Sequence, residues 1–383
     1  MTMHIYDEAL ALMPRLLDWR RFLHQHAEIG YDLPQTTAFI KKVLDEHAIS
    51  YFEPCKSTIV ADIGSGEDGM VLRADMDALP MVEHSGLDFA CTNGNAHTCG
   101  HDMHTAMLLG AAVLLKRHES NLTSRTRLVF QPAEEEATGA TALCATDTLR
   151  PSFKAGFALH MSPAHKAGTL FYKKGPICAS CDEFVITVTG QSCHGAAPHT
   201  GRDPIFAAVQ LYNTLQGIIS RSTSPFDTAV FSVCAFNSGN TNNVVPKEAT
   251  LMGTMRTYDK NVRAAMKTRL ESICQGIGAA NACDVTLRYT TSLPVLASEE
   301  TLTAHLVDAF AHKAPELVTE ELATPFTWSD DFALYDQNMP IAFMILGAQA
   351  SEAPMELHYD DVIFKEDVLA IGTTALVLAA MNI

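Results

Sequence analysis

The chain has 383 residues, of which 47% are hydrophobic and 19% are charged, and its formal net charge is -17. This length and hydrophobic content predict two globular domains and exclude a disordered protein. The acidic balance, with no run of Lys or Arg, excludes nucleic acid and anionic membrane surfaces as partners, because both bind clustered cations.

The first part of the chain alternates helices with short apolar strands. Residues 7–29 and 34–48 have the spacing of helices, and the first of them lacks the basic start and unbroken apolar run of a signal peptide. The run 105–118 is apolar on nearly all sides, which is typical of a helix covered on several faces. Strands are predicted at 58–63, 70–74, 128–131 and 156–160. The alternation predicts an α/β domain with a central, mostly parallel sheet.

The pattern changes after residue 176. Strands are predicted at 183–189, 229–236, 249–257 and 284–289, and helices at 204–221 and 261–280. The order strand, helix, two strands, helix, strand matches the α+β split βαβ sandwich. We therefore assign residues 178–291 to an inserted domain, and residues 1–177 and 292–383 to one discontinuous domain.

The α/β pattern resumes after the inserted domain. Helices are predicted at 299–312, 330–335 and 366–381, and a strand at 341–346. The closing helix contains the most apolar window of the chain, but this window is shorter than the roughly 20 residues of a membrane span. We therefore expect no membrane segment.

Ten cysteines are scattered along the chain, without the dense spacing of a secreted disulfide scaffold. Their distribution predicts a cytoplasmic protein with most thiols reduced. Cys178 and Cys181 form a CxxC pair, but no second pair completes a zinc site. Two small buried residues at a domain junction are the better interpretation.

A dense group of metal-competent side chains lies directly before the apolar run at 105–118. Residues 95–104 contain a thiol, three imidazoles and a carboxylate, and include Cys99 and His101. Thiolate and imidazole are ligands for zinc and related ions. This stretch predicts a metal centre, which is either structural or catalytic.

Further metal-competent residues follow the predicted strands of the first domain. In open α/β sheets, sites form beyond the carboxyl ends of the strands, so these residues are expected to converge on Cys99 and His101. Taken singly, each has a structural alternative, such as a hydrogen-bonded histidine at a strand end or a solvated turn. The residues are Asp75, Asp77, Glu134, Glu135, Glu136, His160 and His358.

Glu134 and Glu135 suit two different roles in one site. Pro132, just ahead of them, predicts an irregular backbone, so both carboxylates can face one pocket. One of them would bind metal. The other would accept a proton from a metal-activated water and deliver it to a leaving amine.

The inserted domain carries a second group of polar residues. Small residues surround His194 and would let a substrate approach. Asn243 and Arg256 follow on neighbouring segments, and an amide with a guanidinium suits a carboxylate, which Arg can bind with two hydrogen bonds. Taken alone, Arg256 is equally consistent with a surface residue on a half-exposed strand.

Five motifs in order, within a match from about His24 to His358, resemble one enzyme family. The chain is similar to the aminoacylase and hippurate hydrolase branch of the dinuclear metallopeptidases, which includes plant hydrolases of indole-acetyl amino acids. Ala96 and Gly195 depart from the usual Met and Ala, which affects pocket shape and removes no ligand. The motifs are Asp75-Met-Asp-Ala-Leu-Pro80, His97-Thr-Cys-Gly-His-Asp-Met-His104, Gln131-Pro-Ala-Glu-Glu135, Cys193-His-Gly-Ala-Ala-Pro-His199 and Asn243-Val-Val-Pro246.

The resemblance implies a metallopeptidase-type catalytic domain that binds two divalent ions. It also implies that the inserted domain is a lid through which the protein forms a homodimer or a higher homo-oligomer. Mixed sulfur, nitrogen and oxygen ligands admit zinc, manganese, cobalt or nickel. The implied ligands are Cys99, His101, Glu135, His160 and His358.

The resemblance also implies roles for other residues. Glu134 would be the general base and acid, and His194 would stabilise the oxyanion in its own or the partner's active site. Asn243 and Arg256 would hold the substrate's α-carboxylate. Residues that orient the ligands from behind would be Asp75, Asp102 and His104.

The predicted activity is hydrolysis of the amide bond of N-acyl-L-amino acids by a metal-activated water. The nearest alternative is a dipeptidase or carboxypeptidase that uses the same centre. Two further alternatives are an inactive dimeric binding protein and a thiol enzyme built on Cys99.

Overall fold

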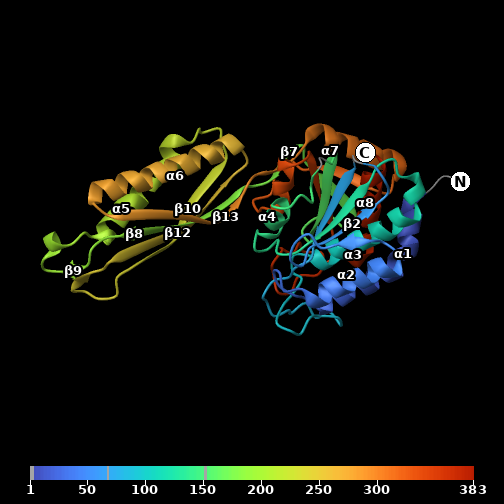
Figure 1. Ribbon diagram of the computed structural model, residues 1–383, viewed down its shortest axis with the longest axis horizontal. Coiled ribbons are helices and arrows are strands. Elements are labelled where there is room, and N and C mark those ends of the chain that lie inside the picture. The colour runs from blue at the N-terminus through green and yellow to red at the C-terminus, as the bar shows by residue number, and fades with distance from the viewer. Residues whose placement is uncertain (1–3, 67–68, 151–152) are drawn as a thin grey trace. The chain divides into compact units, whose positions relative to one another are not determined.

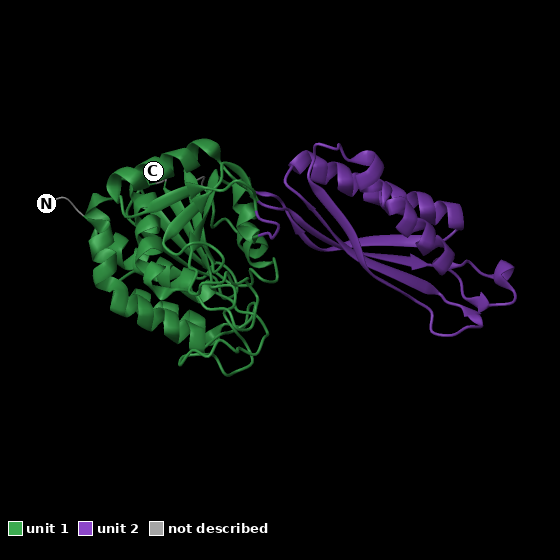
Figure 2. Ribbon diagram, turned by 180° about the vertical axis from the view of Figure 1, so that it is seen from behind, with its two compact units in different colours: residues 1–177, 297–325, 330–383 green, residues 178–296, 326–329 purple. Residues whose placement is uncertain are grey.

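The computed structural model describes residues 4–66, 69–150 and 153–383. The chain divides into two compact units, shown in Figure 2. Unit 2 comprises Cys178–Leu296 and Phe326–Ser329, and unit 1 comprises the rest. Residues 292–296, which the sequence analysis assigned to the discontinuous domain, therefore fall in unit 2. Phe326–Ser329 also falls there, because the backbone N–H of Ala179 donates to the carbonyls of Phe326 and Trp328.

An eight-stranded sheet forms the centre of unit 1, in the order β1-β2-β4-β3-β5-β16-β6-β15. The adjacent strands β4, β3, β5 and β16 run parallel, whereas β1, β2 and the pair β16-β6 are antiparallel. The predicted α/β class with a mostly parallel central sheet is confirmed. The strands are β1 (Tyr51–Phe52), β2 (Ile59–Ile63), β3 (Met70–Asp75), β4 (Thr126–Gln131), β5 (Ala155–Ser162), β6 (Thr169–Tyr172), β15 (Val318–Glu321) and β16 (Ile341–Gly347).

Helices α1, α3 and α8 pack against one another and cover the sheet (Figure 1). A Cβ at Gly110 of α3 would lie 2.7 Å from Leu16 and 2.9 Å from Thr373, so a glycine is needed where the three helices meet. Among the described helices, none combines the length and apolar character needed to cross a membrane. The helices of unit 1 are α1 (Ile5–Gln25), α2 (Pro34–Glu46), α3 (His101–Arg117), α4 (Gly139–Cys144), α7 (Glu300–Lys313) and α8 (Leu369–Met381), with 3-10 turns η1 (Glu119–Asn121), η4 (Asp331–Gln337) and η5 (Glu366–Val368).

Helix α3 begins four residues earlier than predicted, at His101 and not at residue 105. The apolar pattern marks only the later turns, because the first turn carries polar side chains that are nevertheless buried. Gly100 precedes the helix with φ of 86°, a conformation that glycine adopts without strain. The sharp turn aims the start of α3 at the carboxyl ends of the strands.

Unit 2 contains an antiparallel sheet in the order β10-β12-β8-β13, with α5 and α6 along one face (Figure 1). This is the predicted split βαβ arrangement, although α5 ends at Leu215 and a π turn, η3 (Ile218–Ser222), follows it. Its elements are β8 (Cys181–Thr189), α5 (Pro204–Leu215), β10 (Ala229–Ser238), β12 (Glu248–Thr257), α6 (Lys260–Asn281) and β13 (Asp284–Leu293), with the short pair β9 (Cys193–His194) and β11 (Val244–Val245). A further short pair, β7 (Gly175–Cys178) and β14 (Leu296–Ser298), lies mostly in unit 1, where the chain passes between the two units.

A buried carboxylate ties α6 to the sheet of unit 2. Asp182, near the start of β8, accepts hydrogen bonds from Arg263 and Lys267 of α6 and from Ser292 of β13, at 2.6 to 3.0 Å. Its side chain is fully buried. Although burial alone raises the pKa of Asp182, these donors hold that pKa below its ordinary value.

Candidate metal centre and catalytic site

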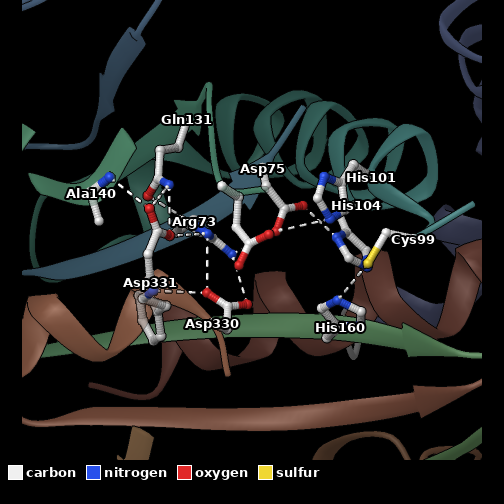
Figure 3. Close-up of polar contacts among 12 residues, drawn as sticks. Arg73, Asp75, Cys99, His101, His104, Gln131, Ala140, His160, Asp330 and Asp331 are labelled. Carbon is white, nitrogen blue, oxygen red and sulfur yellow. Dashed lines mark hydrogen bonds and ion pairs between the residues drawn. The ribbon is translucent and has the colours of Figure 1, made fainter. Parts of the chain in front are cut away.

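The structure brings the five predicted metal ligands together at one end of the unit 1 sheet. His160 lies on β5, Glu135 follows β4, and His358 lies in the segment after β16. Cys99 and His101 come from the turn into α3, as Figure 3 shows. Because β4, β3, β5 and β16 are parallel neighbours, their carboxyl ends meet at one edge.

The five donor groups form two sets of three that share Cys99. The donor atoms of Cys99, His101 and His160 all lie within 4.8 Å of one another, and so do those of Cys99, Glu135 and His358. The Cys99 sulfur lies 3.5 Å from Nε2 of His160 and 3.3 Å from Nε2 of His358. One thiolate can therefore serve two ions side by side.

Backbone carbonyls fix the orientation of two ligand histidines. Nδ1 of His101 donates to the carbonyl of Asp77 at 2.9 Å, and Nδ1 of His160 donates to that of Met161 at 2.7 Å. In its neutral form, each ring therefore presents a lone pair on Nε2 toward the cluster. Nε2 of His101 and Oε1 of Glu135 are buried and have no hydrogen-bond partner among the described residues. Such orphaned acceptors fit a bound cation.

Both ring nitrogens of His104 are engaged by neighbouring groups of the chain. Its Nε2 accepts a hydrogen bond from the backbone N–H of Met161 at 2.8 Å, so its Nδ1 carries the proton and donates to Asp75. The second oxygen of Asp75 accepts from Arg73 at 2.7 Å and lies 3.7 Å from Nε2 of His101. Both oxygens of Asp75 are thereby engaged beside the ligands.

Asp102 lies next to His101 in sequence but points elsewhere. It forms an ion pair with Arg20 at 2.7 Å and a hydrogen bond with His24 at 2.8 Å, which links α3 to α1. Its contacts with these residues hold the first turn of α3. Any effect of Asp102 on the ligands therefore passes through the position of the helix.

Two of the ligands, Cys99 and His101, hold protons in the absence of ions. Burial and the neighbouring Glu135 carboxylate raise the pKa of the Cys99 thiol well above its ordinary value. Burial alone lowers the pKa of His101, but Asp75 and the other carboxylates outweigh it and raise the pKa to about 10. An incoming cation must displace these protons, so we expect ion binding to strengthen with increasing pH.

Glu134 and Glu135 lie on an irregular loop, as the sequence predicted from Pro132. Ala133 adopts a left-handed conformation with φ of 54°. The backbone N–H groups of Glu134 and Glu135 donate to the two oxygens of Asp77, at 3.1 and 3.2 Å. Asp77 thus holds both glutamates, a role that sequence reasoning missed although Asp77 stands in the same motif as Asp75.

Glu134 differs from Glu135 in its surroundings. Its carboxylate lies within 4.8 Å of those of Asp330 and Asp331. Burial, Asp330 and Glu135 raise the pKa of Glu134 well above its ordinary value. By contrast, although burial raises it, His358 and His101 bring the pKa of Glu135 below its ordinary value. One carboxylate suits proton transfer and the other suits a cation.

The remaining predicted residues lie in unit 2 and fall into two places. His194 on β9 pairs with Val244 of β11, directly after Asn243, and both His194 and Asn243 are exposed. Figure 1 shows β9 at one end of the unit 2 sheet. Arg256 lies eight residues along β12 from Glu248, where that strand begins, which is roughly 26 Å at 3.3 Å per residue. One chain therefore does not bring Arg256 together with His194.

The fold and the cluster define a metallopeptidase-type hydrolase: a mostly parallel sheet carries the donor set at its carboxyl edge, and a split βαβ unit is inserted. The model of Peptidase family M20/M25/M40 matches residues 71–382 of the chain. The chain belongs to this family, and the resemblance noted from its motifs is confirmed.

Two relatives and one solved structure illustrate the match. The chain is 40% identical to N-acetyl-L-cysteine deacetylase of Bacillus subtilis, over 88% of this chain and 81% of that protein. It is 32% identical to hippurate hydrolase of Campylobacter jejuni, with 95% or more of each chain covered. A crystal structure of a dinuclear metal-binding M20 peptidase from Bacillus subtilis aligns with a TM-score of 0.82 at 32% identity, over 97% of this chain and 98% of that one.

Proposed function

We propose that the protein hydrolyses the amide bond of N-acyl-L-amino acids in a reaction that depends on two divalent metal ions. The observation that carries this proposal is the pair of donor sets sharing Cys99, with the buried Glu134 beside them. The activities for which the two relatives are named support the substrate class.

The donor set fits two ions such as zinc, manganese, cobalt or nickel. One ion would be held by Cys99, His101 and His160, and the other by Cys99, Glu135 and His358. When bound, such ions supply an acidified water and polarise the acyl carbonyl. The orphaned acceptors on His101 and Glu135 support this assignment.

Glu134 would move the proton in both halves of the reaction. Its carboxylate accepts the proton of the attacking water and passes it to the departing nitrogen of the amino acid. The raised pKa of Glu134 favours this because the group is a stronger base than an ordinary carboxylate. A carboxylate bound to a cation, as proposed for Glu135, could not do so.

Arg256 would bind the substrate's α-carboxylate. Its Nη1 is buried and has no hydrogen-bond partner among the described residues, which suits an anion. His194 would donate to the developing oxyanion, and Asn243 would assist in binding the carboxylate. Because His194 and Arg256 lie far apart within unit 2, we propose that His194 and Asn243 act in the site of a second copy.

The second copy would bind through unit 2 to form a homodimer. Helix α5 exposes apolar side chains along one side, and β10 is an edge strand with exposed Val230 and Phe236. Exposed apolar groups beside an open strand edge favour association. The exposed residues of α5 are Ile205, Phe206, Val209 and Tyr212. We also propose a cytoplasmic location, which ten free cysteines support.

A substrate panel tests the activity. The protein is stripped with a chelator, each metal is added back separately, and the acetyl, benzoyl and aminoacyl derivatives of one amino acid are assayed. We expect chelation to abolish turnover, a metal to restore it, and the acyl derivatives to be preferred. Activity that survives chelation would indicate a thiol enzyme, and preference for the aminoacyl derivative would indicate a dipeptidase.

Mixing two inactive variants tests the shared site. A dimer of one His194→Ala subunit and one Glu134→Gln subunit contains one site with both residues intact only if His194 acts across the dimer. We expect activity to reappear after the subunits exchange. If the mixture stays as inactive as its components, His194 acts within its own chain.

A further inference from the structure

A carboxylate distant in sequence closes the loop that carries both active-site glutamates. The loop, residues 132–138, begins after Gln131 at the end of β4 and ends where α4 starts at Gly139, so Ala140 lies in the first turn of that helix. Asp331 of η4 accepts hydrogen bonds from Nε2 of Gln131 at 2.8 and 2.9 Å and from the backbone N–H of Ala140 at 2.8 Å. Figure 3 shows Asp331 between these two residues. One fully buried side chain thus joins both ends of the loop.

We propose that Asp331 is a positioning residue that holds this loop, and through it Glu134 and Glu135, in the working conformation. This inference rests on the proposed function of the two glutamates. Asp331 does not touch the reacting atoms in this assignment. Its carboxylate also lies within 4.8 Å of that of Glu134, and its positioning role runs through its hydrogen bonds with Gln131 and Ala140.

The loop has features that require outside support. Ala133 and Ala137 both have φ of 54°, in the left-handed region that a residue with a Cβ disfavours. The ends of the loop also lie very close together, since a Cβ on Gly139 would be 1.8 Å from the carbonyl oxygen of Pro132. A strained conformation of this kind persists only when the surrounding structure fixes it.

Two carboxylates divide this support. Asp77 binds the backbone at Glu134 and Glu135, in the middle of the loop. Asp331 binds the two ends. If either carboxylate is removed, the other still binds the loop. The loop would therefore become more mobile at one point and keep its overall conformation.

The amide of Gln131 is fixed in the orientation that this role needs. Its Oε1 accepts hydrogen bonds from Nε of Arg73 at 3.2 Å and from the hydroxyl of Tyr335 at 3.0 Å. Its Nε2 is therefore turned toward Asp331. Arg73 also pairs with Asp331 at 2.7 Å, and it is shared with Asp75 and Asp330, so one guanidinium serves three buried carboxylates.

The main test is the Asp331→Asn variant. An amide in place of the carboxylate turns an N–H group toward one of its present donors, so at least one end of the loop is released. We expect kcat at saturating metal to fall about 10²-fold with a much smaller change in KM, since a small misplacement of a catalytic group costs this much. Metal affinity should fall roughly 10- to 100-fold, because Glu135 lies in the same loop.

A matched control removes another carboxylate that pairs with an arginine in unit 1. Asp62 of β2 binds Arg127 of β4 through both oxygens, at 2.8 and 2.7 Å, and touches neither end of the loop. Asp62→Asn should lower the unfolding temperature and leave kcat and metal affinity unchanged. If both variants lower kcat equally, the effect is general destabilisation and the inference is overturned.

Ala140→Pro provides a second variant in case Asp331→Asn does not fold. It deletes only the N–H that donates to Asp331 and leaves every charge in place, and proline is accepted in the first turn of a helix. We expect a loss of kcat in the same direction. Normal kcat and metal affinity in a folded Ala140→Pro or Asp331→Asn protein would overturn the inference.

A double variant separates this inference from the proposed function. If Asp331 acts through Glu134, adding Asp331→Asn to Glu134→Gln should not lower kcat further at saturating metal, because the effects are not additive. Additive losses would overturn the positioning role. If Glu134→Gln alone retains normal turnover, the proposed function itself fails.

Discussion

The proposed ligand cluster of unit 1 and the β9 end of unit 2 place functional residues in opposite surroundings. Cys99, His101 and His160 are buried, and backbone carbonyls fix the two histidines. His194 and Asn243 are exposed and lie on or beside strands of two residues. The difference teaches that the fold of one chain preorganises the cluster, whereas it leaves the side chains at the β9 end exposed, where we propose that a second copy binds.

The largest expected effect lies on the buried side of this comparison. Glu134→Gln should lower kcat by roughly 10² to 10⁴, the contribution of a positioned acid and base. Metal content should stay at the wild-type level, because Glu134 is not one of the proposed ligands. Steady-state kinetics with elemental analysis checks both, and near-normal turnover would remove Glu134 from the mechanism.

Cys99→Ser should reduce metal occupancy. The sulfur belongs to both donor sets, so its loss should weaken binding of both ions by more than the roughly 10- to 100-fold expected for a group that only orients a ligand. Elemental analysis after dialysis measures the result. Unchanged metal content would mean that Cys99 is not a ligand and that other residues form the preorganised metal site.

Asp182→Asn tests the contacts between α6 and the sheet of unit 2. It should lower the free energy of unfolding by about 2 to 3 kcal/mol. This is less than for a fully buried ion pair, because the cationic partners of Asp182 are partly exposed. The depressed pKa of Asp182 makes this contribution complete above about pH 4 and lost as pH falls through that pKa. Denaturation of wild type and variant across this range measures it. Stabilities that differ equally at neutral and acid pH would contradict the assignment.

The smallest expected effect is that of His194→Ala on the stability of the separated subunit. An exposed side chain on a short strand should change the free energy of unfolding by less than about 0.5 kcal/mol, although the same variant should lose activity. Chemical denaturation at low protein concentration provides the measurement. A large loss of stability would mean that His194 supports the fold of unit 2.

Much of the fold could be predicted because its strands are short, apolar and separated by clear turns. The pattern for β3 and β16 agreed with the structure to within one residue at each end. Strand β15 was missed because Val318–Glu321 is largely exposed and has little apolar pattern. The start of α3 was misplaced because buried polar side chains in its first turn hide the helical period.

The residues of the candidate site were likewise predicted only in part. The proposed ligands stand in short motifs or at strand ends, so sequence reasoning found them. Asp75 and His104 were also found from the sequence, whereas the sequence did not mark the backbone carbonyls or the distant carboxylates such as Asp331, which meets Gln131 across 200 residues. No local sequence pattern marks such a contact, because it depends on how η4 packs against α4 and β5 in the folded chain.

The strand order of unit 1 has a consequence for synthesis on the ribosome. Strand β16 lies between β5 and β6 in the sheet, yet it leaves the ribosome after all of unit 2. The edges of β5 and β6 stay open until then, whereas the sheet of unit 2 can close earlier. We therefore expect the domain whose translation starts first to finish folding last, with its open edges exposed to aggregation in the nascent chain.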